Sequence, residues 1–463
     1  MVRIFKHYIP KSLIVLTLLE VLVFILSIYA GVAIRLPGDA MQSLEEVYPL
    51  FPRALLFALV MVSCMTSMGL YQRHLRDGRR GMVFRLVLAL TLGFFSMSVL
   101  FYLFPGLFLG RGVIGFAFVL VVIGIIITRL SYIKIVHQDT LNKRVMIIGA
   151  GKNANLIEER LKRKTDRRGF TIVGYIDLPE EDTEVEAAKV LHPDVSLLDF
   201  AVRMDVDEIV VAVTDRRKPF PVEELVDCKM SGIEVVDLLT FFERQAGRII
   251  LDILTPRWLI FSDGFRKGLA RDLLKRLMDV FVSILLFVPA IPIMVLTAIA
   301  IKLDDRGPVF YKQVRVGKNW KLFQVRKFRS MGVDAEKDGA KFAEKNDIRV
   351  TRVGGFIRKT RIDELPQLLN VMMGDMSFVG PRPERPKFVE KFTQEIPYYS
   401  ERHRVKPGLT GWAQIGYPYG ASDKDTIEKL QFDLYYVKNY SVFLDVMILF
   451  QTAEVILWGK GAR

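Results

Sequence analysis

The sequence contains little cysteine and little histidine. Only two of the 463 residues are cysteines, Cys64 and Cys228, so the chain has neither a disulfide framework nor a cysteine-rich metal site. The five histidines do not follow the spacing of metal ligands. Zinc chemistry and thiol chemistry are therefore disfavoured.

Apolar residues and positive charge, by contrast, are both abundant. Hydrophobic residues make up 51% of the chain, aromatic residues make up 11%, and the formal net charge is +14. This apolar content excludes intrinsic disorder. A mean hydropathy of +0.27 together with a pI near 9.6 fits an inner-membrane protein whose basic segments face an anionic leaflet. The same combination argues against a nucleic-acid binder.

The hydrophobicity is concentrated in the first third of the chain. Four apolar runs have about the 20 residues that a membrane-spanning helix needs, and they cover residues 12–34, 54–71, 82–104 and 112–127. The first run is too long for the core of a signal peptide, so we expect it to be retained. Glu20 and Arg85 lie inside these runs, where they either serve function or pack the helices together; we favour packing.

The distribution of charge predicts the orientation in the membrane. Basic residues precede the first run, lie between the second and third, and follow the fourth, whereas the first connecting loop carries Asp39, Glu45 and Glu46. The positive-inside rule then places the N-terminus and everything after the fourth run in the cytoplasm.

A fifth apolar segment, residues 277–301, complicates this topology. If it crossed the membrane, it would export a tail that is more basic than acidic. Pro289 and Pro292 lie in its middle, and each removes a backbone donor and bends a helix. From these residues alone, a re-entrant helix within 272–303 and an ordinary kinked span are equally open. The last apolar stretch, residues 441–458, contains Asp445 and two further polar side chains, which favours a helix at the interface or packed on the domain.

The middle of the chain alternates strand and helix signals, which predicts a parallel, doubly wound α/β sheet. The expected strands are 144–148, 170–176 and 208–213, and the expected helices are 155–164 and 223–231. Gly149 and Gly151 follow the first strand in a G-x-G-x-x-A pattern, and Asp177 ends the next strand. This pattern is typical of nucleotide binding, but it also occurs where a strand and a helix only pack closely, and we favour that second interpretation. No tyrosine is followed by lysine four residues later, which removes the acid/base pair of a short-chain nucleotide-sugar oxidoreductase.

Cations surround one adjacent acid pair in the last third of the chain. Neighbouring side chains on a helix diverge by about 100°, so Asp363 and Glu364 cannot act on the same atom. Phosphoryl transfer needs a nucleophile, a metal-binding carboxylate and cations on the phosphate oxygens, and this segment contains all three types. Pro381 and Pro383 fix the backbone on both sides of Arg382 for contact with phosphate. Taken alone, the pair also fits an exposed helical acid pair balanced by arginines.

Five stretches of this segment closely resemble the bacterial sugar transferase family, the monotopic polyprenyl-phosphate hexose-1-phosphate transferases. They are residues 325–331, 357–370, 374–383, 406–415 and 432–439. The resemblance covers about residues 271–458, and its Asp-Glu-Leu-Pro and Gly-Asp-Met-Ser-Phe-Val-Gly-Pro-Arg-Pro strings are highly specific. Four spans and a Rossmann-like module before this segment resemble the long subgroup that primes exopolysaccharide synthesis.

The resemblance implies a two-step reaction. The aspartate of the pair, Asp363, attacks the β-phosphate of a UDP-sugar, forms a covalent sugar-phosphate and releases UMP. Polyprenyl (undecaprenyl) phosphate then takes the sugar-phosphate from the aspartate. Glu364 matches a carboxylate associated with Mg²⁺. The family pattern and the local charge together predict substrate binding by Lys327, Arg329, Arg358, Arg361 and Arg382; Asp433 and Asp445 match family acids without an assigned role.

The expected architecture therefore has three parts. Residues 1–138 form a four-helix transmembrane bundle, 139–255 form a Rossmann-like cytoplasmic domain, and 256–463 form a mainly α-helical transferase domain with a re-entrant helix. Because UDP-sugars are cytosolic, the resemblance favours the re-entrant form, although Ile291-Pro292 stands where the family often has Ser-Pro. The alternatives are a membrane-anchored oxidoreductase and an inactive scaffold. A homodimer stays open, and the sequence does not identify the sugar or a ligand of the central domain.

Overall fold

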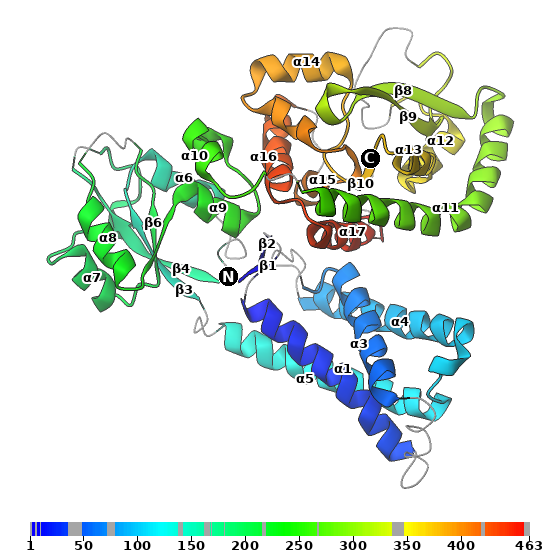
Figure 1. The fold of residues 1–463 in the computed structure, drawn as a ribbon, viewed down its shortest axis with the longest axis horizontal. Helices are drawn as coiled ribbons and strands as arrows, with labels where there is room; N and C mark the ends of the chain where they lie inside the picture. The colour runs from blue at the N-terminus through cyan, green and yellow to red at the C-terminus, as the bar shows by residue number, and fades with distance from the viewer. Residues whose placement is uncertain are drawn as a thin grey trace. The chain divides into compact units, whose positions relative to one another are not determined.

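The structure is a computed structural model, and it describes residues 2–4, 7–9, 11–35, 49–71, 79–137, 142–161, 167, 169–179, 181–214, 219–265, 268–335, 347–417 and 422–457. Tyr8–Gly247 form most of one compact unit and Arg248–Arg463 most of a second (Figure 1). The second unit begins before the predicted boundary at 255/256, because the backbone N–H of Ile249 donates to Gln431 (3.1 Å) and Arg248 pairs with Glu428 (2.8 Å). The loops that carry Asp39, Glu45, Glu46, Arg73 and Arg76 lie outside the described residues.

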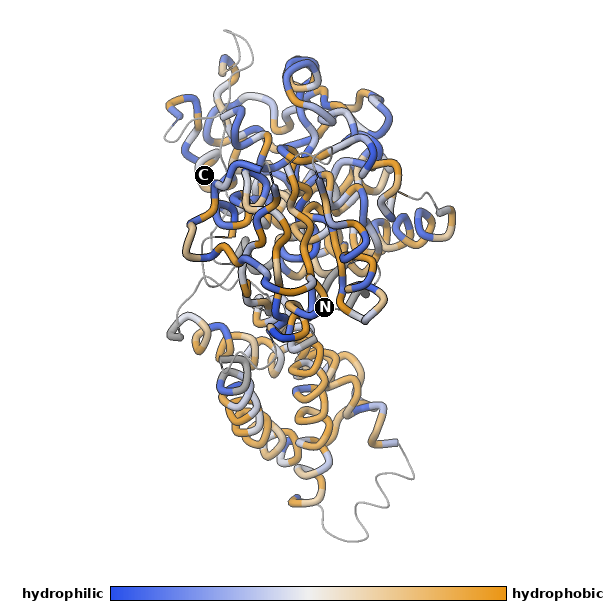
Figure 2. The backbone as a smooth tube through the Cα atoms, turned by 90° about the vertical axis from the view of Figure 1, so that its left-hand side faces the viewer, coloured by the Kyte–Doolittle hydropathy of each residue, from blue (hydrophilic) through white to orange (hydrophobic). Residues whose placement is uncertain are grey.

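The predicted apolar runs form helices in the first unit. These are α1 (Lys11–Arg35), α3 (Leu50–Ser67), α4 (Arg79–Leu103) and α5 (Arg111–His137). All four are long and apolar enough to cross a membrane, and Figure 2 colours their tubes mostly orange. Buried side chains from all four helices share one core, which includes Phe24, Phe57, Met61, Ala89 and Val121. The short strands β1 (Val2–Ile4) and β2 (His7–Ile9) precede them.

The charged residues inside these helices serve packing. Glu20 is fully buried; its carboxylate accepts from Arg129 Nε of α5 (2.8 Å) and from the Tyr71 hydroxyl. Arg85 is 2% exposed, and its Nη1 donates to the Met68 carbonyl just after α3 (2.9 Å). A buried charge is stable only when it is paired, so these contacts fix how neighbouring helices meet.

We predict that the Glu20–Arg129 pair stabilises the helical core cooperatively. Glu20→Ala and Arg129→Ala should each lower the free energy of unfolding by about 3 kcal/mol, because each leaves a buried charge unpaired. The double variant should lose clearly less than the sum of the two. Unfolding in detergent micelles measures this, with Arg111→Ala at an exposed position of α5 as the control. Additive losses would show that the two charges are not coupled.

The rest of the first unit is the predicted parallel sheet. Its strand order is β5-β4-β3-β6-β7, with β3 at Lys143–Ile148, β4 at Phe170–Ile176, β5 at Val190–Leu191, β6 at Glu208–Val211 and β7 at Glu234–Asp237. The connecting helices are α6 (Lys152–Arg160), η2 (Ala187–Lys189), α7 (Leu197–Arg203) and α8 (Val222–Met230), and α9 (Leu238–Ala246) follows the last strand. The central strand β3 ends in four fully buried residues, as a strand covered on both faces requires. The predicted strand 208–213 ends two residues early, and the helix predicted over 155–164 begins at Lys152 and ends at Arg160.

The second unit is mainly helical. Before the acid pair lie η3 (Leu251–Ile253), α10 (Pro256–Phe261), α11 (Leu269–Asp305), β8 (Phe310–Val316), η4 (Lys318–Trp320), β9 (Leu322–Phe328) and α12 (Arg352–Lys359). From the pair onward come η5 (Ile362–Glu364), α13 (Gln367–Met373), β10 (Ser377–Val379), α14 (Pro386–Glu395), η6 (Tyr399–Arg404), β11 (Gly408–Thr410), α15 (Trp412–Gly416), α16 (Asp423–Asn439) and α17 (Val442–Leu457). Strands β8 and β9 form an antiparallel hairpin, and β10 pairs in parallel with β11.

Helix α11 continues through both prolines. It contains Pro289 and Pro292 within its 37 residues, and Figure 1 shows that its two halves run in different directions. Near its start, Arg276 donates to the carbonyls of Val371 and Met372 (2.6 Å each). Near its end, Asp304 accepts from the backbone N–H of Val353 (3.0 Å). Both ends of α11 therefore bind other elements of the second unit.

The last helix packs on the same unit. The side chain of Asp445 in α17 is fully buried and bound to Lys275 of α11 (2.5 Å). Of the two interpretations of the final apolar stretch, packing on the domain is the one observed.

Candidate active site

The acid pair lies on a tight turn between two helices. Helix α12 ends at Lys359, Arg361 takes a left-handed backbone conformation (φ 61°), and Ile362–Glu364 then form one turn of 3₁₀ helix before α13. A residue other than glycine is uncommon at such a φ and is found where its surroundings hold it there. The turn places Asp363 and Glu364 in different surroundings, so their chemistry differs.

Glu364 is held by three cations from three elements. Its Oε1 lies 2.9 Å from Lys327 Nζ of β9 and 2.9 Å from Arg382 Nη2, and Arg361 Nη1 lies 3.7 Å away. Burial alone would raise the pKa of the Glu364 carboxyl, but Lys327, Arg382 and Arg361 outweigh burial and hold this pKa well below its usual range. Glu364 is therefore ionised throughout the physiological pH range.

Asp363 is buried without equivalent support. Its side chain is 8% exposed, and its Oδ1 is buried without a hydrogen-bond partner among the residues the structure describes. Burial raises the pKa of this carboxyl above its usual value against the pull of Lys327, and the negative charge of Glu364 raises it further. A carboxylate with a poorly solvated, unbonded oxygen is a reactive nucleophile.

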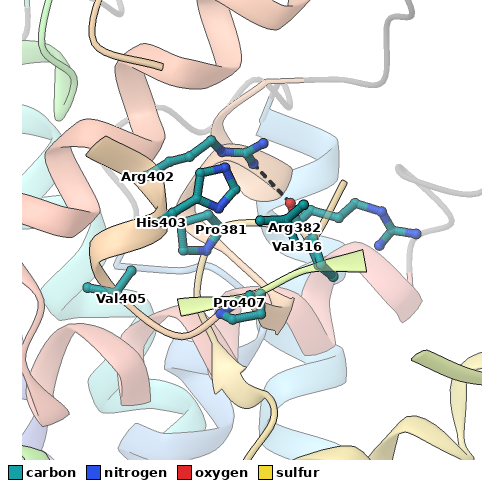
Figure 3. Close-up of a pocket in the computed structure, with 9 residues that line it drawn as sticks. Val316, Pro381, Arg382, Arg402, His403, Val405 and Pro407 are labelled. Atoms are coloured by element: carbon teal, nitrogen blue, oxygen red, sulfur yellow. Dashed lines mark hydrogen bonds between the residues drawn. The ribbon is translucent and has the colours of Figure 1, made fainter. Parts of the chain in front are cut away.

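The backbone around Arg382 is anchored from behind. The Arg382 carbonyl accepts from Arg402 Nη2 (2.9 Å), and Arg402 itself pairs with Asp433 (2.8 Å) and bonds the Tyr399 hydroxyl (2.8 Å). Figure 3 shows the Arg402–Arg382 contact beside Pro381, with the two guanidinium groups apart from one another. The anchored backbone fixes where the Arg382 side chain begins, and this side chain reaches Glu364.

An open pocket adjoins Arg382 on the side of α15 and α16. It is lined by Arg382, Glu384, Arg402, Gly411, Ala413, Gln414, Tyr417, Lys429 and Asp433. The pocket lies beside the arginine that contacts the acid pair.

Two of the predicted substrate-binding arginines, Arg329 and Arg358, are not among the cations that contact Glu364 in the described part of the chain. Arg329 pairs with Asp305 at the end of α11 and donates to the Pro308 carbonyl (2.7 Å), so the structure uses it to close the α11–β8 connection. Arg358 lies half-buried in the last turn of α12, and its carbonyl accepts from Arg361 (3.3 Å). Substrate binding by these two residues stays a prediction, whereas Lys327, Arg361 and Arg382 do converge on Glu364.

Residues of α11 that the sequence interpretation missed position the site. Lys275 Nζ donates to the Val379 carbonyl (3.1 Å) as well as to Asp445, and Asp279 accepts from Ser377 Oγ (2.9 Å) and from the backbone N–H of Phe378 (3.0 Å). These bonds hold β10, which leads directly into the loop of Arg382. The sequence did contain a signal for these residues, because Lys275 and Asp279 are opposite charges four residues apart at the start of an apolar run.

Asn370 connects the two elements that carry the acid pair and Lys327. Its side chain is fully buried in α13, accepts from the Arg326 backbone N–H (3.1 Å) and donates to the Gln324 carbonyl (2.7 Å) of β9. There was no reason to select Asn370 from the sequence, because its side chain binds only backbone groups of β9 and takes part in no recognisable chemical motif.

The glycine turn of the central sheet has the expected position. Gly149 follows β3 with φ 107°, and Gly151 is the N-cap of α6. Asp177, however, contacts His192 Nδ1 (3.1 Å). Ribose binding by Asp177 therefore stays a prediction that competes with this contact.

Comparison with known proteins decides the family. Residues 270–459 match a family model described as bacterial sugar transferase. A UDP-glucose:undecaprenyl-phosphate glucose-1-phosphate transferase of Klebsiella pneumoniae is 36% identical over 321 residues, which cover 67% of this chain and 67% of that protein. The chain belongs to the bacterial sugar transferase family.

Further relatives carry other names. A UDP-N-acetylgalactosamine-undecaprenyl-phosphate N-acetylgalactosaminephosphotransferase of Aeromonas hydrophila is 45% identical over 52% of this chain, and the match spans just over half (56%) of that relative. An exopolysaccharide production protein of Rhizobium leguminosarum bv. phaseoli is 42% identical over 41% of this chain and 98% of its own length. Residues 66–218 match a model described as a CoA-binding domain.

We predict that the two carboxylates of this sugar transferase affect stability in opposite directions. Asp363→Asn should raise the unfolding midpoint at pH 7.5, because it removes a buried charge with a raised pKa, whereas Glu364→Gln should lower it, because three cations lose their partner. Each 1 kcal/mol shifts the midpoint by about 2–4 °C for a domain of this size.

The effects of both substitutions should depend on pH. The advantage of Asp363→Asn should disappear below about pH 3.9, where aspartate of the unfolded chain is also protonated. The loss in Glu364→Gln should be fully present above about pH 4.3 and shrink as the pH falls further. Thermal unfolding in detergent across this pH range measures both effects. A destabilised Asp363→Asn variant at pH 7.5 would contradict the assignment of Asp363 as a buried carboxyl with a raised pKa.

Proposed function

We propose that this protein transfers a sugar 1-phosphate from a UDP-sugar to polyprenyl (undecaprenyl) phosphate and so primes exopolysaccharide synthesis. The observation that carries the proposal is the asymmetry of the acid pair: Glu364 is held by Lys327 and Arg382 at 2.9 Å, while Asp363 keeps a buried oxygen without a partner among the described residues. One carboxylate is thus fixed by cations and the other is available for attack. The names of the relatives, undecaprenyl-phosphate sugar phosphotransferases, support the same reaction.

In the first step, the Asp363 carboxylate attacks the β-phosphorus of the UDP-sugar. A bond forms between a carboxylate oxygen and phosphorus, and the bond from that phosphorus to the oxygen that bridges the two phosphates breaks, so UMP leaves with the electron pair. Arg382 and Lys327 lie where they can bind the phosphate oxygens, and charge-assisted bonds of this kind stabilise the charge that develops during transfer.

In the second step, a phosphate oxygen of the polyprenyl phosphate attacks the aspartyl phosphate. The new oxygen–phosphorus bond gives polyprenyl-diphospho-sugar, and Asp363 leaves as a carboxylate, which regenerates the enzyme. The burial that makes Asp363 a poorly solvated nucleophile also keeps water away from the acyl phosphate and so favours transfer over hydrolysis.

The site also fits Mg²⁺ of the kind that phosphate substrates bring with them. Within the described part of the chain, no three acidic, histidine or cysteine side chains group into a protein-only metal site. Mg²⁺ usually takes one or two carboxylates together with substrate phosphates, and Glu364 with the unbonded Asp363 oxygen supplies that donor set. Glu364 would hold the ion, which would neutralise charge on the diphosphate.

The protein is proposed to lie in the bacterial plasma membrane, with its catalytic unit in the cytoplasm and α11 as a re-entrant helix. The middle of α11 is apolar and exposed, for example at Leu285 (59%) and Leu296 (68%), which suits contact with lipid. Its two ends nevertheless bind one catalytic unit through Arg276 and Asp304. A straight helix between these residues would span about 42 Å at 1.5 Å per residue, more than the hydrocarbon core of a bilayer.

Cysteine labelling tests the re-entrant topology. Leu269→Cys and Leu303→Cys, at the exposed ends of α11 (93% and 80%), should both react with a membrane-impermeant maleimide in inverted vesicles and not in spheroplasts, after Cys64 and Cys228 are replaced. Phe104→Cys, beyond the third span, should show the opposite pattern and serves as the control. Labelling of the two α11 positions from opposite sides would establish a crossing helix.

Release of UMP tests the reaction itself. Purified protein with Mg²⁺, undecaprenyl phosphate and a panel of UDP-glucose, UDP-galactose and UDP-N-acetylgalactosamine should release UMP with at least one donor, and Asp363→Asn should reduce the rate at least 10³-fold because the nucleophile is lost. Asp423→Asn, an exposed acid on α16, is the matched control.

The covalent step has its own measurement. Without acceptor, a donor labelled in its β-phosphate should label the wild-type chain and not Asp363→Asn. Full turnover by Asp363→Asn would overturn the mechanism, and release of UDP instead of UMP would overturn the reaction class. A chain that releases no nucleotide with any donor would be an inactive scaffold.

A further inference from the structure

The central sheet has one position at which a doubly wound fold binds ligands. The strand order β5-β4-β3-β6-β7 reverses direction between β3 and β6, and ligands of such folds bind in the crevice at the carboxyl ends of these two strands. Here the crevice is bordered by the Gly149–Gly151 turn after β3 and by Thr214 after β6. A phosphate would normally bind there at the N-terminus of the following helix, α6.

The side chain of Glu181 already occupies this position. Its Oε1 accepts from the backbone N–H of Thr214 (3.0 Å). A Cβ atom placed on Gly151 would lie 2.8 Å from Glu181 Oε1 and 2.9 Å from its Cδ and Cγ, and one placed on Gly149 would lie 3.2 Å from Oε2. The carboxylate therefore packs directly against both glycines, in the space that their missing side chains leave.

The backbone that follows Glu181 covers the same turn. The N–H groups of Glu184 and Val185 both donate to the carbonyl of Ala150, at 2.9 and 3.1 Å. These bonds hold the segment Glu181–Val185 over the turn. They also occupy the carbonyl of Ala150, the central residue of the turn. Glu181 is thus fixed by its own backbone neighbourhood as well as by its carboxylate.

One oxygen of this carboxylate has no hydrogen-bond partner among the described residues of the crevice. Glu181 Oε2 is buried, and no described residue offers it a hydrogen bond. A buried oxygen without a partner is unfavourable for folding. A negatively charged group at a glycine turn and helix N-terminus has the place and the charge of a ligand phosphate.

We propose that Glu181 keeps the glycine turn of the central domain closed to phosphate-bearing nucleotides. The carboxylate fills the phosphate position and repels a second anion from it. Binding of a nucleotide through Gly149 and Gly151 requires the segment Glu181–Val185 to move away, so the turn is a latent site held shut by an internal contact. This inference is independent of the chemistry proposed at Asp363.

Nucleotide titration of the full-length protein in detergent tests the closed state. ADP, CoA and NADH are the probes, because each carries a diphosphate. The wild type and Glu184→Ala, which removes an exposed charge from the same segment, should bind all three weakly, and Glu181→Ala should bind at least one of them at least tenfold more tightly. Equal affinity of the wild type and Glu181→Ala would overturn the proposal, as would absence of binding in every variant.

Hydrogen exchange of the Thr214 amide tests the contact without any ligand. Glu181→Ala removes its acceptor, so this amide should exchange at least tenfold faster, while Glu181→Gln keeps an acceptor oxygen and should preserve the wild-type rate. The same rate in Glu181→Ala and in the wild type would show that the carboxylate does not occupy the crevice.

Discussion

Two adjacent carboxylates remain ionised in a half-buried site only when nearby cations compensate them, and the catalytic unit is organised around this constraint. Lys327, Arg361 and Arg382 come from three different segments and meet at Glu364. Their positions have to be accurate, because electrostatic stabilisation in a region of low dielectric falls off steeply when a charge is misplaced. Several other polar contacts of the unit hold the segments that carry these side chains.

Two of these cations, Lys327 and Arg382, are supported through the backbone of their own segments. The buried amide of Asn370 joins α13 to β9 and thereby sets the distance between the acid pair and Lys327. The ion pair of Arg402 and Asp433 supports the backbone of Arg382 from the opposite side. Networks of this kind are stable when every member is satisfied, and they fix one arrangement of the elements that they join. The site is therefore a property of the whole unit rather than of one motif.

The sequence predicted the elements better than it predicted the contacts between them. The four apolar runs, the parallel strands and the acid pair follow from periodicity, hydrophobicity and motif, which are local properties. Arg329 and Lys327 are two residues apart and look equivalent in the sequence, yet Arg329 is paired with Asp305 and Lys327 with Glu364. This choice depends on where the end of α11 lies, and no local pattern contains that information. Likewise, Glu181 meets Gly151 across 30 residues, without any periodic signal.

The polar residues at the start of α11 constrain the order of events during synthesis. The partners of Lys275, which are Val379 and Asp445, lie 104 and 170 residues further along the chain. The partners of Asp279, which are Ser377 and Phe378, lie 98 and 99 residues further along. Until those partners have been made, the helix presents an apolar surface together with two uncompensated charges, and charges are unfavourable in lipid. The polar contacts of α11 are therefore complete only after the C-terminal helix α17 has been made, so α11 takes its final place in the unit only when the end of the chain joins it.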